Sequence, residues 1–385
     1  MLPVTVVGSG MAGMALVREL RKRAPDCPIT LITAESGEAY SKPMLSTALA
    51  QGQGPERLVQ TRGEDWARSL QVTLHAGVRV DAIDLAARRL VAGAQYFPFD
   101  RLVLATGARP VDPGLGGDAA DEVLSVNSLD DYRRFRERLT QARRVAILGG
   151  GLIGCEFAND LAAAGYAVDV IHPRAAPLER LLPLQAGEMI RDALARLGVD
   201  WHLQSRALTV TREAGRLVVT LDSGSRVTAD VVLSAIGLRP ETRLAREAGL
   251  DVGRGIRVDR RLQTAVEGIH ALGDCAEVDG HVLPYVQPLL IQARALAAIL
   301  CGEGRPLVYP VMPVMIKTPA MPAVALPAPD GVAAQWQTEW TADGLIASQT
   351  DAAGGLAGFA LLGAATAERQ RFAARIRPLF AVDGD

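Results

Sequence analysis

The sequence predicts an α/β fold with two Rossmann-like dinucleotide-binding domains, the second inserted into the first, and a small α+β C-terminal domain. Two glycine fingerprints support this prediction, because each follows a strand-like apolar run and opens a helix-like segment. A strand ending in Gly-x-Arg-Pro also occurs twice, at residues 102–110 and 232–240, which indicates duplication. The expected domains are residues 1–112 with 241–314, residues 113–240, and residues 315–385.

The composition of this 385-residue chain indicates a multidomain globular protein. Hydrophobic residues make up 49% and charged residues 22%, so a large core can form. A net charge of -2 gives no general attraction to nucleic acid or to anionic membranes. No unbroken apolar run reaches about 18 residues, so we expect no membrane insertion. The four cysteines form no disulfide or zinc pattern, which favours a reducing, cytoplasmic location.

The first unit is predicted as strand, tight loop, helix and strand, over residues 4–8, 11–24 and 29–33. Its loop contains Gly8, Gly10 and Gly13. The first glycine permits the turn, the second lets backbone approach a pyrophosphate, and the third lets the helix pack on the strand. Glu35 lies 22 residues after Gly13, near the offset of about 20 expected for an acid that bonds ribose hydroxyls.

The second unit repeats this pattern over residues 144–149, 152–165 and 167–171, with glycines at Gly149, Gly151 and Gly154. At the place that corresponds to Glu35, the sequence reads His172-Pro173-Arg174, with no acid. Arg174 could attract the 2′-phosphate of NADP, or it could be an exposed loop charge. The sequence therefore leaves NAD and NADP open at this second site.

Shorter elements complete the expected order. Residues 78–91 and 206–224 are predicted as β-meanders, one in each unit. A strand at 268–272 precedes Gly273-Asp274, and a helix is expected through 289–302. In the C-terminal region we expect antiparallel strands and a final helix, at residues 336–340, 346–350, 358–363 and 367–376.

Three further features could serve a redox cofactor. In the segment Tyr40-Ser-Lys-Pro-Met-Leu-Ser46, Lys42 could place a positive charge that stabilises a reduced flavin. Asp274 could accept hydrogen bonds from a ligand hydroxyl, although a Gly-Asp pair alone is more often a turn. Glu156 lies in the first turn of the second unit's helix, where an acid also simply stabilises the helix dipole.

Together with Ala105-Thr106-Gly107, these motifs resemble the FAD-dependent pyridine nucleotide–disulfide reductase superfamily. The segments YSKPMLS, GLIGCEFANDL, GLRPET, ALGDCAEVDG and IKTPAMP are most similar to rubredoxin reductases, including those that serve flavorubredoxin. The resemblance implies that FAD and NADH are the cofactors, with NADPH as an alternative donor at the second glycine loop. It implies a catalytic role for Lys42, paired with Glu156, and for Lys317 of the C-terminal region. It assigns FAD to Gly8, Gly10, Gly13, Glu35, Lys42, Pro43, Thr106, Gly107, Gly273, Asp274 and Lys317.

The cysteine positions indicate where the electrons go. Disulfide reductases of this superfamily need a cysteine pair beside the flavin, and their peroxide-reducing relatives need one cysteine shortly after the position of Lys42. Here that stretch reads Met44-Leu45-Ser46. We therefore expect hydride transfer from NADH to FAD, followed by single-electron transfer to rubredoxin or a rubredoxin-like carrier. The alternatives are a ferredoxin reductase of a monooxygenase system, an NADH oxidase, and a redox-responsive binding protein with slow turnover.

Overall fold

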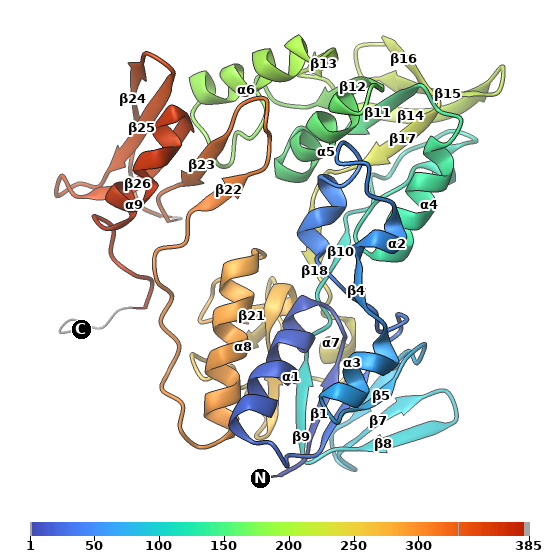
Figure 1. Cartoon of the computed structure of the whole chain (residues 1–385), viewed down its shortest axis with the longest axis vertical. Coiled ribbons are helices and arrows are strands. Elements are labelled where there is room, and N and C mark those ends of the chain that lie inside the picture. Colours follow the sequence, from blue (N-terminus) through green and yellow to red (C-terminus); the bar gives the residue numbers. More distant parts are fainter. Residues whose placement is uncertain (1, 330, 381–385) are drawn as a thin grey trace.

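The computed structural model describes residues 2–329 and 331–380 (Figure 1). The first unit is built on a parallel sheet of order β20-β9-β1-β2-β5. Its strands are short and mostly buried, as expected for strands covered on both faces. The sheet comprises β1 (Val4–Val7), β2 (Ile29–Ile32), β5 (Thr73–His75), β9 (Arg101–Leu104) and β20 (Ile269–Ala271). Because β20 follows the second unit in the chain, the second unit is inserted into the first, as predicted.

Helices α1 (Met11–Arg23) and α8 (Val286–Leu300) pack against each other beside this sheet (Figure 1). An antiparallel sheet of β6 (Ala82–Asp84), β7 (Arg89–Ala92) and β8 (Gln95–Pro98) forms the predicted meander. The smaller elements of this unit include β3 (Ala39–Tyr40), the 3₁₀ helix η1 (Lys42–Ser46), α2 (Pro55–Leu58), β4 (Val59–Thr61), α3 (Gly63–Ser69), α7 (Arg243–Glu247), β19 (Ile256–Val258), η3 (Gly273–Cys275) and β21 (Ala276–Val278).

The second unit repeats the architecture with a parallel sheet of order β13-β12-β11-β17. Its elements are η2 (Ala120–Glu122), α4 (Leu129–Leu139), β11 (Arg144–Leu148), α5 (Leu152–Ala163), β12 (Ala167–His172), α6 (Leu184–Arg196), β13 (Val199–Leu203), the meander β14 (Ala207–Glu213), β15 (Arg216–Leu221) and β16 (Arg226–Ala229), and β17 (Val231–Ser234). The two Gly-x-Arg-Pro segments pair antiparallel as β10 (Ala108–Pro110) and β18 (Leu238–Pro240), so the duplicated motif joins the units.

The C-terminal region forms an antiparallel sheet of order β22-β23-β26-β25-β24. Its strands are β22 (Val314–Ile316), β23 (Ala323–Leu326), β24 (Trp336–Thr341), β25 (Gly344–Thr350) and β26 (Leu356–Gly363), which confirms the three predicted strands. The final helix was predicted too long: the structure has η4 (Ala364–Glu368) and then the short α9 (Arg369–Ala373). Bonds from Arg375 N–H to Phe372 O and from Ile376 N–H to Ala373 O tighten the chain beyond it, as in many helix ends.

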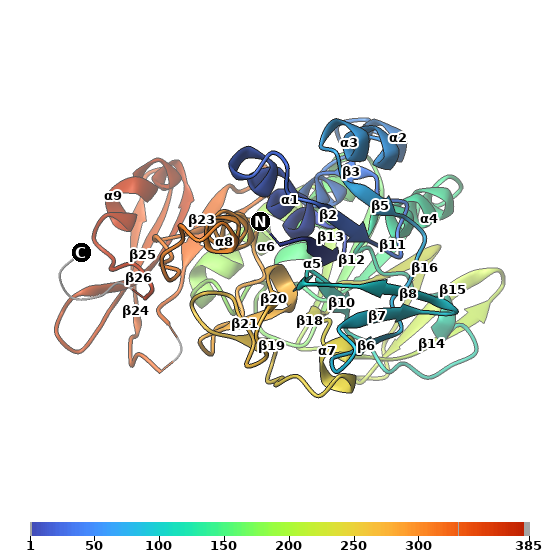
Figure 2. The same ribbon diagram turned by 90° about the horizontal axis from the view of Figure 1, so that it is seen from below.

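One hydrophobic core joins the C-terminal sheet to the second unit. Ile316, Ala323 and Leu345 of the sheet belong to the same buried cluster as Phe157 of α5, and Leu45 of η1 also belongs to it. Figure 2 shows the C-terminal strands at one end of the molecule and the meanders of both units at the other. Among the described residues, no helix has the length and apolarity needed to cross a membrane. The boundaries proposed for the domains stay a prediction.

Candidate functional site

The first glycine loop has the geometry of a pyrophosphate cradle. Gly8 has φ +112°, and a Cβ there would lie 2.2 Å from the carbonyl oxygen of Ala105. A Cβ at Gly13 would lie 2.0 Å from the carbonyl oxygen of Gly8. At Gly10, by contrast, a Cβ would meet nothing within 4 Å. Close packing therefore requires the outer two glycines, while the middle one leaves open space at the N-terminus of α1, where an anion is stabilised.

The second loop repeats this arrangement at the N-terminus of α5. A Cβ at Gly149 would lie 2.6 Å from the carbonyl oxygen of Ala235, and one at Gly154 would lie 1.9 Å from that of Gly149. Gly151 again has nothing within 4 Å. Two loops of one chain therefore each have room for a pyrophosphate, and the residues present fit two dinucleotides.

Five of the other predicted FAD residues lie after the carboxyl ends of strands in the first sheet. Glu35 follows β2 and is exposed, Thr106 and Gly107 follow β9, and Gly273-Asp274 open η3 directly after β20. This edge of a parallel sheet is where α/β proteins bind nucleotides. The Thr106 hydroxyl donates a hydrogen bond to the carbonyl oxygen of Glu241 at 2.7 Å. Thr106 therefore also anchors the chain at Glu241, directly after β18, where it returns from the second unit to the first.

Lys42 and Asp274 share one polar region of this edge. Burial lowers the pKa of the Lys42 amine, and Asp274 is the strongest opposing influence. Burial raises the pKa of the Asp274 carboxyl, and Lys42 opposes that shift. The Lys42 Nζ donates to Asn127 Oδ1 at 2.7 Å, and Asn127 Nδ2 donates to the carbonyl oxygen of Ala108 at 2.8 Å. Asn127 thus fixes the amine of Lys42 relative to β10.

The structure corrects the expected partner of Glu156. Its carboxylate is 1% exposed and pairs with Lys317, whose Nζ lies 2.9 Å from Oε2. The backbone N–H of Lys317 also donates to Glu156 Oε1 at 3.2 Å, and the Ser46 hydroxyl donates to Oε2 at 2.6 Å. Lys317 Nζ donates further to Ser46 Oγ and to the carbonyl oxygen of Pro43. The prediction of a Lys42–Glu156 pair was wrong, because Lys317 contacts Glu156 through both its backbone and its side chain.

Two more polar side chains of α5 bond to backbone groups of the segments that surround Glu156. Asn159 Oδ1 accepts a bond from the backbone N–H of Ala320 at 3.1 Å, next to the loop of Lys317. Asp160 accepts bonds from the backbone N–H groups of Leu49 at 3.0 Å and Ala50 at 2.9 Å, just after η1. Glu156, Asn159 and Asp160 therefore join η1, α5 and the loop at residues 317–320.

Sequence reasoning assigned no role to Ser46 or Asn127, which are both uncharged. His172, to which the sequence analysis gave no role in binding, is buried against the second glycine loop and accepts a bond from Gly150 N–H at 3.0 Å. Cys155 and Cys275 are buried, and burial raises the pKa of both thiols. Neither thiol is therefore set up as a reactive thiolate.

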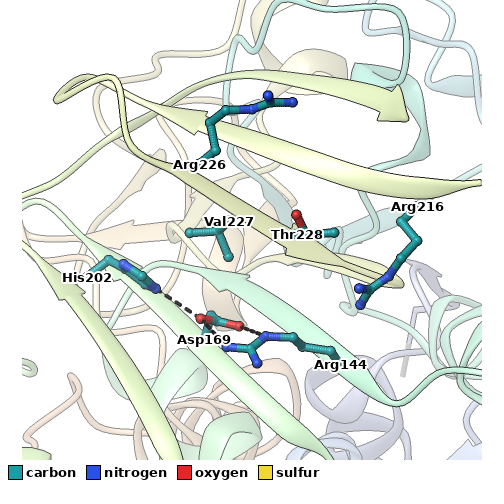
Figure 3. A pocket seen from close by; sticks show the side chains of 7 residues that line it. All are labelled: Arg144, Asp169, His202, Arg216, Arg226, Val227 and Thr228. Carbon is teal, nitrogen blue, oxygen red and sulfur yellow. Dashed lines mark hydrogen bonds and ion pairs between the residues drawn. The ribbon is translucent and has the colours of Figure 1, made fainter. Parts of the chain in front are cut away.

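A separate hollow of about 270 Å³ in the second unit contains none of the predicted site residues (Figure 3). The buried Asp169 lies at its base, 2.6 Å from Arg144 Nε and 3.0 Å from His202 Nε2. Burial acts to raise the pKa of Asp169, but hydrogen bonds from His202 and Arg144 outweigh it and lower that pKa. Arg216 is paired with Asp230 at 2.8 Å. These charged side chains are therefore paired, and we interpret them as a structural ion-pair network.

Comparison with known proteins agrees with this geometry. The family model of pyridine nucleotide-disulphide oxidoreductases matches residues 2–295, and that of the rubredoxin binding C-terminal domain matches residues 306–376, starting before the boundary expected at 315. The chain is 46% identical to a rubredoxin-NAD(+) reductase of Alcanivorax borkumensis, over 96% of this chain and 97% of that protein. It is 37% identical to a nitric oxide reductase FlRd-NAD(+) reductase of Vibrio vulnificus, over 94% of each.

Solved structures agree as well. The crystal structure of the ferredoxin reductase for the CYP199A2 system from Rhodopseudomonas palustris superposes with a TM-score of 0.85 at 28% identity, covering 94% of this chain and 91% of that one. Putidaredoxin reductase in its covalent complex with putidaredoxin gives a TM-score of 0.86 at 25% identity, covering 97% and 93%. This chain belongs to the rubredoxin reductase family within the pyridine nucleotide-disulphide oxidoreductases.

Proposed function

We propose that this chain is an FAD-dependent NADH:rubredoxin oxidoreductase. The observation that carries the proposal is the pair of open glycine loops in one chain, joined through α5 to a C-terminal region of the rubredoxin-binding type. One loop suits a resident cofactor and its duplicate suits an exchanged donor. FAD, when bound, accepts a hydride and releases electrons singly, which links a two-electron donor to a one-electron acceptor.

The first sheet would hold FAD. Gly10 leaves room for the pyrophosphate, and Glu35 would accept hydrogen bonds from the adenosine ribose. Asp274 would accept bonds from the hydroxyls of the ribityl chain, since it opens η3 at the same sheet edge. The second loop, around Gly151, would hold the nicotinamide nucleotide.

The two lysines would play different parts. Lys42 is hydrogen-bonded to a neutral amide, so its positive charge remains available to stabilise negative charge in the site. The charge of Lys317 is paired with Glu156 at 2.9 Å, and the same side chain bonds Ser46. Lys42 would therefore act electrostatically on the cofactor. Lys317 and Glu156 would mainly hold the segment around Pro43 in place.

Cysteine usage supports direct electron transfer and a cytoplasmic location. Cys27, Cys155 and Cys275 are buried and belong to no disulfide. With no dithiol in the segment Lys42–Ser46, electrons would pass from the cofactor to the acceptor protein without a thiol relay. Free thiols are typical of proteins from a reducing compartment.

An anaerobic bleaching experiment tests the proposal. The FAD-loaded protein is reduced with NADH and mixed with oxidised rubredoxin, and loss of the iron centre's visible colour is followed with time. Fast catalytic bleaching is expected. A [2Fe–2S] ferredoxin serves as the comparison acceptor, because ferredoxin reductases share the fold. Faster turnover with the ferredoxin, or an NADH-reduced protein that bleaches neither carrier, would contradict the proposed acceptor.

A further inference from the structure

The strand that leads to the second nucleotide site ends in a histidine whose hydrogen bonds define its tautomer. His172 closes β12, and its side chain is 6% exposed. The backbone N–H of Gly150, inside the glycine loop, donates to His172 Nδ1 at 3.0 Å. Since Nδ1 accepts, the proton of the neutral ring lies on Nε2. That Nε2–H donates to Glu179 Oε2 at 3.0 Å.

The chain after β12 folds back so that this contact can form. Leu178 adopts φ +61°, a conformation that is unfavourable for leucine, and its side chain is 2% exposed. Its backbone N–H donates to the carbonyl oxygen of Gly150 at 2.9 Å. Both main-chain polar groups of Gly150 are therefore bonded, the N–H to the His172 ring and the carbonyl oxygen to the backbone N–H of Leu178. The result places Glu179 beside the end of β12, seven residues after His172.

The acidic Glu179 and the basic Arg174 both lie near this strand end, but they differ in solvent exposure. The Glu179 side chain is 34% exposed, so its carboxylate is fixed by His172 yet open to solvent. Arg174 is 68% exposed, and its Nε lies 4.0 Å from Glu179 Oε1. In dinucleotide-binding units this strand end faces the adenosine ribose. An acid there binds the 2′-hydroxyl of NAD, and an arginine accommodates the 2′-phosphate of NADP.

We propose that Glu179 is the ribose-binding carboxylate of the second nucleotide site, that His172 positions it, and that it makes the site selective for NADH over NADPH. The carboxylate accepts hydrogen bonds from the ribose hydroxyls and repels a 2′-phosphate. Arg174 cannot reverse this preference, because its nearest charged partner is Glu179 itself. This inference rests on the proposed function, since it assumes that the second loop binds the electron donor.

The test measures binding without electron transfer. ADP-ribose and 2′-phospho-ADP-ribose carry the adenosine halves of NADH and NADPH but no nicotinamide, so they leave the flavin oxidised. Their dissociation constants are measured by calorimetry on the FAD-loaded protein. We expect ADP-ribose to bind more tightly to the wild type. Glu179→Gln should weaken ADP-ribose about tenfold, the scale of a hydrogen bond to a charged group, and should tighten 2′-phospho-ADP-ribose. Glu188→Gln on α6 makes the same charge change in the same unit and serves as the control. Its ratio of the two dissociation constants, that of 2′-phospho-ADP-ribose over that of ADP-ribose, should equal the wild-type ratio.

A second variant tests the positioning role. His172→Asn keeps an acceptor for Gly150 N–H but is too short to reach Glu179. In the His172→Asn background, Glu179→Gln should change the ratio of the two dissociation constants less than it does in the wild type. An equal change in both backgrounds would remove His172 from the assignment.

Two outcomes separate this inference from the proposed function. If the wild type binds ADP-ribose but Glu179→Gln leaves the ratio unchanged, Glu179 is not the ribose ligand, and the nucleotide site itself stands. If the wild type binds neither compound, the second nucleotide site is refuted, and this assignment with it.

Discussion

The buried histidine of β20 makes the first unit sensitive to acid. His270 is 3% exposed, and its Nδ1 lies 3.2 Å from the carbonyl oxygen of Leu262, which can only accept. The neutral ring therefore carries its proton on Nδ1. Burial lowers the pKa of His270 to about 4, from an ordinary value of 6.5. Since β20 leads directly into Gly273-Asp274, its stability affects the proposed FAD site.

The sign and size of the effect follow from this pKa. The unfolded chain binds a proton on this histidine below pH 6.5, whereas the folded protein does so only below about pH 4. The unfolded state is therefore favoured progressively as the pH falls between these values. One pKa unit corresponds to about 1.4 kcal/mol, so the full loss is about 3 kcal/mol. Between pH 8 and pH 5, the His270 contribution to the free energy of unfolding falls by about 2 kcal/mol.

The assay compares the wild type with His270→Asn at both pH values. Asparagine keeps a donor for Leu262 O but does not titrate, and the cost of its smaller volume cancels when each protein is compared with itself. Urea unfolding followed by the rise of flavin fluorescence reports the first unit selectively. We expect the variant to lose about 2 kcal/mol less stability than the wild type between pH 8 and pH 5. Equal losses in the two proteins would refute the assigned protonation of His270.

Three further changes test the site. Gly151→Val should abolish ADP-ribose binding while leaving the unfolding free energy near that of the wild type, because its Cβ has open space; retained binding would contradict the pyrophosphate cradle. Glu156→Gln should lower the urea unfolding free energy by about 2 kcal/mol, since it removes the charge partner of the half-exposed Lys317; unchanged stability would count against the hydrogen-bonded network. Asn127→Asp should lower the flavin midpoint potential by about 30 mV, if the charge added beside Lys42 disfavours the reduced form by about 1.4 kcal/mol. A potential unchanged in spectroelectrochemistry would remove Lys42 from electrostatic control.

The fold was predictable because its signals are local. Each βαβ unit combines a short apolar strand, a glycine loop and a helix within about 30 residues. The requirement for Gly8 and Gly13 comes from backbone contacts to Ala105 and within the loop, so it recurs wherever that loop is built. The short strand-like segments within residues 336–363 likewise indicated the C-terminal strands. The final helix was less predictable, because short helix-forming segments depend on tertiary contacts for their length.

The partners of the charged residues were not predictable from local patterns. Lys42 meets Asn127 across 85 residues of sequence, and Ser46 meets Glu156 across 110. Two lysines could have reached Glu156, and the position of β22 in the shared core decided in favour of Lys317. Glu179 is close to His172 in sequence, but their contact depends on a positive φ at Leu178 that no residue type there signals.

Helix α5 explains why these contacts matter together. Its N-terminus adjoins the second glycine loop, and its first three turns carry Glu156, Asn159 and Asp160, each at most 5% exposed. Those side chains bond the segment after Lys42 and the loop at residues 317–320. One buried core also includes α5, η1 and the C-terminal sheet. A buried polar network of this kind is costly to break, because each separated partner would be left unsatisfied. The donor loop, the Lys42 segment and the rubredoxin-binding region are therefore held in one fixed arrangement, which favours electron exit over a preset distance rather than movement of the C-terminal domain.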